Sequence, residues 1–94
     1  MENIYDINAK VFKALSNSSR LKIINMLSQG EKCACTILKD FEFTQPTLSH
    51  HMNVLMDCGL VVCRKDGIWS YYSLDLTNGN RLVLFLMNII TDTK

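Results

Sequence analysis

Residues 44–52 read Thr44-Gln45-Pro46-Thr47-Leu48-Ser49-His50-His51-Met52 and predict the start of a helix. Thr44 is a suitable N-cap, and Pro46 falls in the first turn, where its missing N–H costs no hydrogen bond. We expect this helix to run to about Cys58 and to end at Gly59. At about 100° per residue, its apolar and polar residues separate onto two faces. The apolar face holds Leu48, Met52 and Leu55, and the opposite face holds Pro46, Ser49, His50, Asn53 and Asp57.

The segments on either side of this helix predict a winged helix-turn-helix. A short helix is expected at about residues 35–41, and a tight connection joins it to the helix at 44–58, an order typical of a helix-turn-helix. Beyond Gly59, residues 60–65 and 68–74 are rich in Val, Ile, Trp and Tyr and flank Asp66-Gly67. An Asp-Gly dipeptide between two such runs predicts a β-hairpin, the wing.

Three further helices complete the predicted fold. The first spans residues 4–15; the second begins near Asn17, Ser18 or Ser19 and ends before Gly30. The last, at about residues 80–90, is apolar almost all round, so it must be buried, and we expect a second copy of the chain to cover it. The expected fold is therefore mainly α with a small β-hairpin, in the order ααααββα, as one domain over residues 1–94.

Composition limits the possible classes of function. The 94 residues are 48% hydrophobic, which suits one packed domain and excludes general disorder. Ten basic residues oppose nine acidic ones, so any DNA contact must come from local geometry rather than net charge. The longest apolar run, near residues 82–90, is shorter than the roughly 20 residues of a membrane span. Because residues 1–13 lack a signal-peptide pattern, we expect a cytoplasmic protein without a membrane partner.

The helix at 44–58 and the hairpin supply the candidate DNA contacts. Small polar side chains at the start of a recognition helix can reach base edges, and its free N–H groups suit a phosphate. Polar residues on a helix face are often merely solvated, but their order along some 40 residues favours DNA recognition. His51 is expected to be structural, on the apolar side. The predicted DNA-binding residues are Gln45, Thr47, Ser49 and His50 in the helix, with Arg64 and Lys65 in the wing.

Two of the four cysteines form a Cys-x-Cys pair, Cys33 and Cys35. In a reducing cytosol such thiols are free, metal-binding or redox-active rather than a disulfide framework. Thiolates favour soft, thiophilic ions, but residues i and i+2 of a regular helix point about 200° apart. One ion can therefore bridge the pair only if the backbone there is extended or unwound. We expect Cys58 and Cys63 to be small buried apolar residues.

The sequence resembles the ArsR (ArsR/SmtB) family of bacterial metalloregulatory repressors. The resemblance covers about residues 11–74. It rests on Ala14-Leu15-Ser16, Arg20-Leu21-Lys22-Ile23, Glu31-Lys32-Cys33-Ala34-Cys35, the 44–52 phrase, Gly59-Leu60-Val61 and Trp69-Ser70-Tyr71-Tyr72-Ser73-Leu74. It implies a homodimer formed through the first and last helices, which binds double-stranded operator DNA at an imperfect palindrome and needs no cofactor to do so.

Cys33 and Cys35 resemble the inducer site of the arsenite- and antimonite-responsive branch, and the resemblance implies that As(III) or Sb(III) releases the operator. Leu38 stands where many members carry a third cysteine, so the third ligand stays open. Two alternatives keep the winged helix: a redox or reactive-sulfur switch at the same thiols, and sensing of Cd(II) or Pb(II). A thiol oxidoreductase is disfavoured, because the chain lacks Cys-x-x-Cys and a βαβ pattern. We therefore expect no enzyme. A dimerisation module without DNA affinity is disfavoured by the recognition-helix pattern of residues 44–52.

Overall fold

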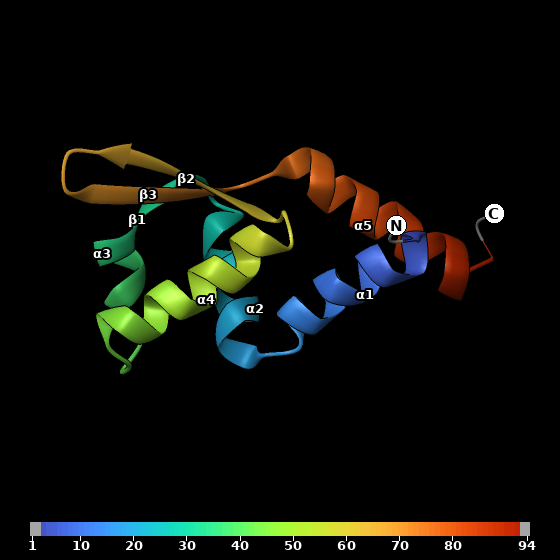
Figure 1. The fold of residues 1–94 in the computed structure, drawn as a ribbon, viewed down its shortest axis with the longest axis horizontal. Helices are drawn as coiled ribbons and strands as arrows, with labels where there is room; N and C mark the ends of the chain where they lie inside the picture. Colours follow the sequence, from blue (N-terminus) through green and yellow to red (C-terminus); the bar gives the residue numbers. More distant parts are fainter. Residues whose placement is uncertain (1–2, 93–94) are drawn as a thin grey trace.

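The computed structural model describes residues 3–92, which form five helices and a small three-stranded antiparallel sheet that lies along one edge of the molecule (Figure 1). The predicted domain of residues 1–94 also includes residues 1–2 and 93–94, which lie outside the described part. The elements confirm a mainly helical fold with a wing. In chain order they are α1 (Ile4–Leu15), α2 (Ser18–Leu27), β1 (Lys32–Cys33), α3 (Ala34–Leu38), α4 (Gln45–Asp57), β2 (Val61–Asp66), β3 (Trp69–Leu74) and α5 (Leu76–Ile90).

Side-chain caps explain where three of the helices begin. The side-chain oxygens of Asn3, Asn17 and Asp75 accept hydrogen bonds from backbone N–H groups three residues later, at 2.9, 3.0 and 3.1 Å. Each such bond satisfies an N–H that has no partner inside the helix. The cap at Asp75 also corrects one prediction, because α5 begins at Leu76 instead of about residue 80 and includes Gly79.

The sheet differs from the predicted hairpin in having a third strand. Lys32 and Cys33 form β1, which pairs with Tyr72 and Tyr71 of β3, so the strand order is β1-β3-β2. A strand of two residues is too short to show the alternation by which strands are recognised in a sequence. The adjoining helix is also shorter than predicted, since α3 spans Ala34–Leu38.

The hairpin itself is confirmed, with its loop one residue later than the Asp-Gly dipeptide. Asp66 pairs with Trp69, so the two loop residues are Gly67 and Ile68. Gly67 has φ +61°, and a positive φ at the first loop position is what a type II′ turn requires. The turn thus keeps β2 and β3 in register at the end of the molecule opposite α1 and α5 (Figure 1).

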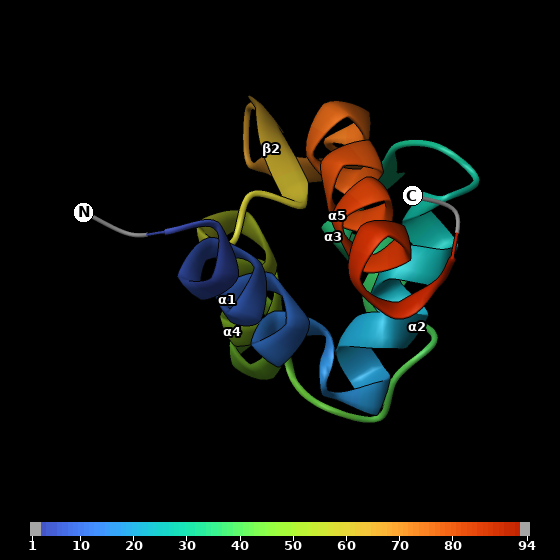
Figure 2. The ribbon, with the colours of Figure 1, turned by 90° about the vertical axis from the view of Figure 1, so that its right-hand side faces the viewer.

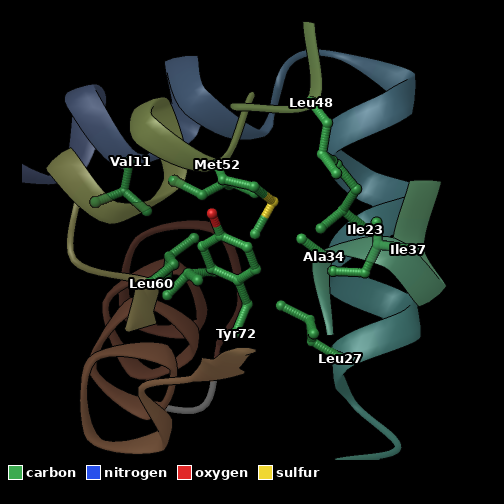
Figure 3. Close-up of a cluster of buried hydrophobic side chains, with 11 residues drawn as sticks. Val11, Ile23, Leu27, Ala34, Ile37, Leu48, Met52, Leu60 and Tyr72 are labelled. Atoms are coloured by element: carbon green, nitrogen blue, oxygen red, sulfur yellow. The ribbon is translucent and has the colours of Figure 1, made fainter. Parts of the chain in front are cut away.

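The core lies mainly between α2, α3, α4 and the sheet, and Val11 of α1 also belongs to it. The predicted apolar face of α4 is confirmed, because Leu48, Met52 and Leu55 are fully buried, together with Ile23 and Ile37. Tyr72 reaches into this cluster from β3 and lies beside Met52 (Figure 3). The three helices and the sheet therefore form one packed body, which fixes the direction in which the outer face of α4 points.

Helices α1 and α5 project from that body, and we call this pair the arm (Figure 1). Tyr5 and Phe12 of α1 contact Phe85 of α5, with ring centroids 6.1 and 6.3 Å apart. α5 contributes no buried residue, although it is strongly apolar. No helix within residues 3–92 is both long and apolar enough to cross a membrane.

Candidate DNA-binding face and thiol pair

The polar face of α4 is open to solvent. Gln45, Thr47 and His50 are exposed, and Ser49 is half-buried. The Gln45 amide lies 3.4 Å from the Ser49 hydroxyl, and the hydroxyls of Thr44 and Thr47 are also 3.4 Å apart. The structure therefore brings the four predicted contacts of α4 together in its first two turns, as side chains that both donate and accept hydrogen bonds.

The N-terminus of α4 also leaves backbone groups available. Thr44 is the N-cap, as predicted, but its side chain makes no capping hydrogen bond. The Thr44 carbonyl accepts a hydrogen bond from the Leu48 N–H at 3.0 Å, and this is the first backbone hydrogen bond of the helix. The N–H groups of Gln45 and Thr47 precede this bond, whereas Pro46 has none, so these two amides and the helix dipole place partial positive charge at the start of the polar face.

The two predicted wing residues have different surroundings. Arg64 and Lys65 are neighbours in β2, so their side chains point to opposite faces of the sheet. Arg64 forms a bidentate ion pair with Glu31, at 2.8 and 3.2 Å, and its guanidinium lies 4.5 Å from the centroid of the Tyr71 ring. This ion pair lowers the pKa of Glu31. Lys65 is exposed and has no ion-pair partner within residues 3–92.

His51 is buried, which confirms that it is a structural residue. An Arg20 Nη1–H donates to its Nδ1 at 3.1 Å, while Arg20 Nε–H donates to the Ala14 carbonyl at 2.6 Å. Burial lowers the pKa of His51, and the positive charge of Arg20 and the neighbouring His50 add to this effect. A neutral His51 thus accepts from Arg20 and ties α4 to the ends of α1 and α2.

Cys33 and Cys35 lie close enough to share a ligand. Their Sγ atoms are 2.8 Å apart. This is possible because Cys33 is the extended N-cap of α3, with φ −68° and ψ 144°, whereas Cys35 is in the first turn. The sequence required an extended or unwound backbone for the two thiols to approach one ion. This requirement is met, because Cys33 lies just outside the helix and Cys35 just inside it.

The environment of the pair favours a thiolate. The pKa of Cys35 is lowered, chiefly by hydrogen bonding with the Cys33 thiol, and further by Thr36 and the charge of Lys39. Cys35 is exposed and Cys33 half-buried, so both can be reached from solvent. Within residues 3–92 no three His, Cys, Asp or Glu side chains converge into a group that could hold a metal ion.

The thiol pair is also connected to the wing, which the sequence did not reveal. Cys33 pairs with Tyr71 across β1 and β3, and Arg64 pairs with the same Tyr71 across β3 and β2. Residues directly opposite in a sheet share a face, so Cys33, Tyr71 and Arg64 form one row. Glu31, two residues before Cys33, closes the row through its ion pair with Arg64.

The other two cysteines lie elsewhere. Cys58 is half-buried at the end of α4, and its thiol donates to the Leu55 carbonyl at 3.3 Å. Cys63 is exposed on β2, so the expectation that it is buried was wrong. The outer positions of this short wing face solvent on both sides, and only Val61 of β2 is buried.

Comparisons with known proteins agree with this arrangement. This chain is similar to a solution structure from Mycobacterium bovis, with a TM-score of 0.76 and 31% identity over 92% of this chain and 80% of that one. That structure is described as the homodimeric winged helix-turn-helix DNA-binding domain of a possible ArsR-family transcriptional regulator. The class defined by the fold is therefore the winged helix-turn-helix. Residues 17–62 match the family model described as bacterial regulatory protein, arsR family.

Two curated relatives place the chain within that class. The arsenical resistance operon repressor of Staphylococcus aureus is 55% identical over 65 residues, which are 69% of this chain and 62% of that repressor. A cadmium resistance transcriptional regulatory protein CadC homolog, also from Staphylococcus aureus, is 43% identical over 83 residues, 87% of this chain and 68% of that protein. The chain belongs to the ArsR family of bacterial regulatory proteins.

Proposed function

We propose that this chain is a dimeric transcriptional repressor that leaves its operator DNA when As(III) or Sb(III) binds to Cys33 and Cys35. The observation that carries the proposal is the thiol pair, with sulfurs 2.8 Å apart at the start of α3. α3 leads through a short turn into α4, whose exposed polar face has the composition of a recognition surface. The proposed ligand site at the start of α3 and the proposed DNA site on α4 are thus separate, and α3 and the turn after it connect them.

DNA binding is supported by the open polar face and the available amides of α4. We assign base or phosphate contacts to Gln45, Thr47, Ser49 and His50, and backbone contacts to Lys65 and Arg64 of the wing. Because Glu31 already pairs with Arg64, this arginine can approach a phosphate only in competition with that carboxylate. Lys65 is therefore expected to contribute more of the wing's attraction for DNA.

The arm supports dimer formation. Most of its large apolar side chains are exposed, and α5 has no buried residue in the single chain. A hollow of about 640 Å³ lies between α1 and α5. A second copy could cover these helices through the same surface on both chains, as in isologous dimers. The exposed apolar residues of the arm are Ile4, Tyr5, Ile7, Leu76, Val83, Leu84, Met87, Ile89 and Ile90.

Two connections can carry the signal from the thiols. An ion held by both sulfurs must adjust the first turn of α3, which precedes α4. It must also adjust the end of β1, whose row to Tyr71 and Arg64 leads to the wing. A 100-fold loss of operator affinity requires about 2.7 kcal/mol of coupling, and two connections in each protomer make this a modest requirement.

The test is fluorescence anisotropy with the DNA that precedes the gene of this protein, under reducing conditions. Arsenite should release the wild type but not the Cys33→Ser, Cys35→Ser variant. Cys63→Ser is the matched control, because it removes an exposed thiol outside the pair and should respond like the wild type. Release of the double variant by arsenite would disprove the assignment of Cys33 and Cys35.

A cadmium titration addresses the second candidate, which is favoured by the similarity to the CadC homolog. Release by Cd(II) at lower concentration than by arsenite, lost in the same double variant, would keep the thiol site and change the inducer. Peroxide or persulfide treatment, with mass spectrometry of the thiols, tests the redox alternative. An adduct on Cys35 that lowers DNA affinity without any metal would favour it.

A further inference from the structure

A second hollow lies between α1 and α4, outside the recognition face described above, and has a volume of about 350 Å³. One stripe of α1 and one stripe of α4 form its walls, at the i, i+3 and i, i+4 spacings that place side chains on one helix face. Its lining includes Lys10 and Lys13 of α1, Arg20 of α2, and His50 and Asp57 of α4.

The charge of this hollow is unusual for the chain. Three cationic side chains and one carboxylate line it, so it holds more positive charge than the whole protein, whose net charge is +1. Arg20 is held by the Ala14 carbonyl and His51, which fixes one charge beside the hollow. Lys10 and Lys13 are exposed and form no ion pair in the part of the chain that the structure describes.

The hollow is continuous with the proposed DNA-binding face. His50 belongs to both, since it lies on the exposed face of α4 and lines the hollow. α1, α4 and β2 lie along the same side of the molecule, with α5 and α2 on the other (Figure 2). A duplex that meets the outer face of α4 and the wing therefore passes beside Lys10 and Lys13.

We infer that Lys10 and Lys13 bind the sugar-phosphate backbone of the DNA duplex that α4 contacts. The inference rests on the proposed DNA binding and adds a contact site on α1 to it. Lysine contacts to phosphates contribute affinity without sequence preference and release counterions. The carboxylate of Asp57, which also lines the hollow, repels a phosphate bound there. Removing this negative charge therefore strengthens DNA binding.

The test measures affinity for two duplexes, the DNA preceding the gene and an unrelated sequence of the same length, at several salt concentrations. Lys10→Gln with Lys13→Gln should weaken binding to both duplexes about tenfold, and should reduce the salt slope by about 0.9 for each lysine in each protomer. Asp57→Asn should tighten binding to both. Lys32→Gln, on β1 at the opposite edge of the sheet from β2, is the matched control and should bind like the wild type.

Several results would overturn the inference. A double variant with wild-type affinity and salt slope would do so while leaving the proposed function intact, and an effect on only one duplex would mean base recognition instead. An equal loss in Lys32→Gln would show a general charge effect. If the wild type binds neither duplex, the proposed function falls together with the inference.

A small-anion site is tested with inorganic phosphate and DNA-free protein. We expect no saturation below about 10 mM, as the hollow is open and suits a polymer backbone rather than a captured ion. Saturation that the double variant loses, with unchanged DNA affinity, would overturn the inference. Thermal unfolding of the variants should match the wild type, because neither lysine makes an intramolecular ion pair within residues 3–92.

Discussion

The body and the arm bury their apolar residues in opposite ways. The body, built from α2, α3, α4 and the sheet, fully buries Ile23, Ile37, Leu48, Met52 and Leu55. The arm exposes most of its large apolar side chains, and Leu84 and Ile90 of α5 are 60% and 68% exposed. The body therefore buries its largest side chains within one chain, and the exposed arm is the region for which we propose a second copy as cover.

A pair of leucine substitutions should show this difference most strongly. Leu55→Ala leaves a cavity in the closed core and should lower the free energy of unfolding by about 2–5 kcal/mol at every protein concentration. Leu84→Ala in the arm should cost under about 1 kcal/mol in dilute protein and more as the concentration increases. Urea denaturation at several protein concentrations measures both. Equal, concentration-independent costs would show that the arm needs no partner.

Charge placed on the arm should separate the protomers. Met87→Glu puts a carboxylate on the apolar surface of α5 and should raise the dimer dissociation constant at least about 100-fold. Ile68→Glu is the control, since Ile68 is 89% exposed at the tip of the wing and lies outside the arm. Sedimentation measures the mass of each variant. A monomer in Ile68→Glu, or a dimer in Met87→Glu, would place the interface elsewhere.

A smaller effect should distinguish the two adjacent histidines, one in the body and one on its surface. The folded pKa of His51 is lowered by burial, so protonation favours the unfolded chain. The contribution of neutral His51 to the free energy of unfolding should be fully present above the ordinary histidine pKa of about 6.5. It should be lost as the pH falls below that value. His51→Gln should flatten this dependence between pH 5 and 7.5, and the exposed His50→Gln should not. Urea midpoints across this range measure the effect, and identical slopes in all three proteins would refute it.

Local patterns predicted much of the fold and the residues of the thiol pair. The apolar period of α4, the caps at Asn17 and Thr44 and the turn near Gly67 are short-range signals, so each helix and the hairpin could be found from the sequence. Helix ends and the two-residue β1 were missed, because a strand that short is defined by its partner Tyr71-Tyr72 and not by its own residues.

The remaining features depend on residues far apart in the chain. Glu31 and Arg64 are 33 positions apart, and no local pattern indicates that they pair. Lys10 lies on a helix to which the family resemblance gave a role in dimer formation, yet it lines the basic hollow together with residues of α4. The exposure of Cys63 likewise follows from the position of the wing outside the core.

The sequence by itself determined which segments are helical, which face of α4 is apolar, and that two thiols stand one residue apart, since backbone preferences and side-chain periodicity act over a few residues. Only the tertiary structure decided that Cys33 lies outside α3 while Cys35 lies inside it, that β1 links the thiols to the wing, and that α1 adds lysines to the side that α4 and β2 share. Packing sets these relations, because a chain-distant contact forms only where the core brings two surfaces together.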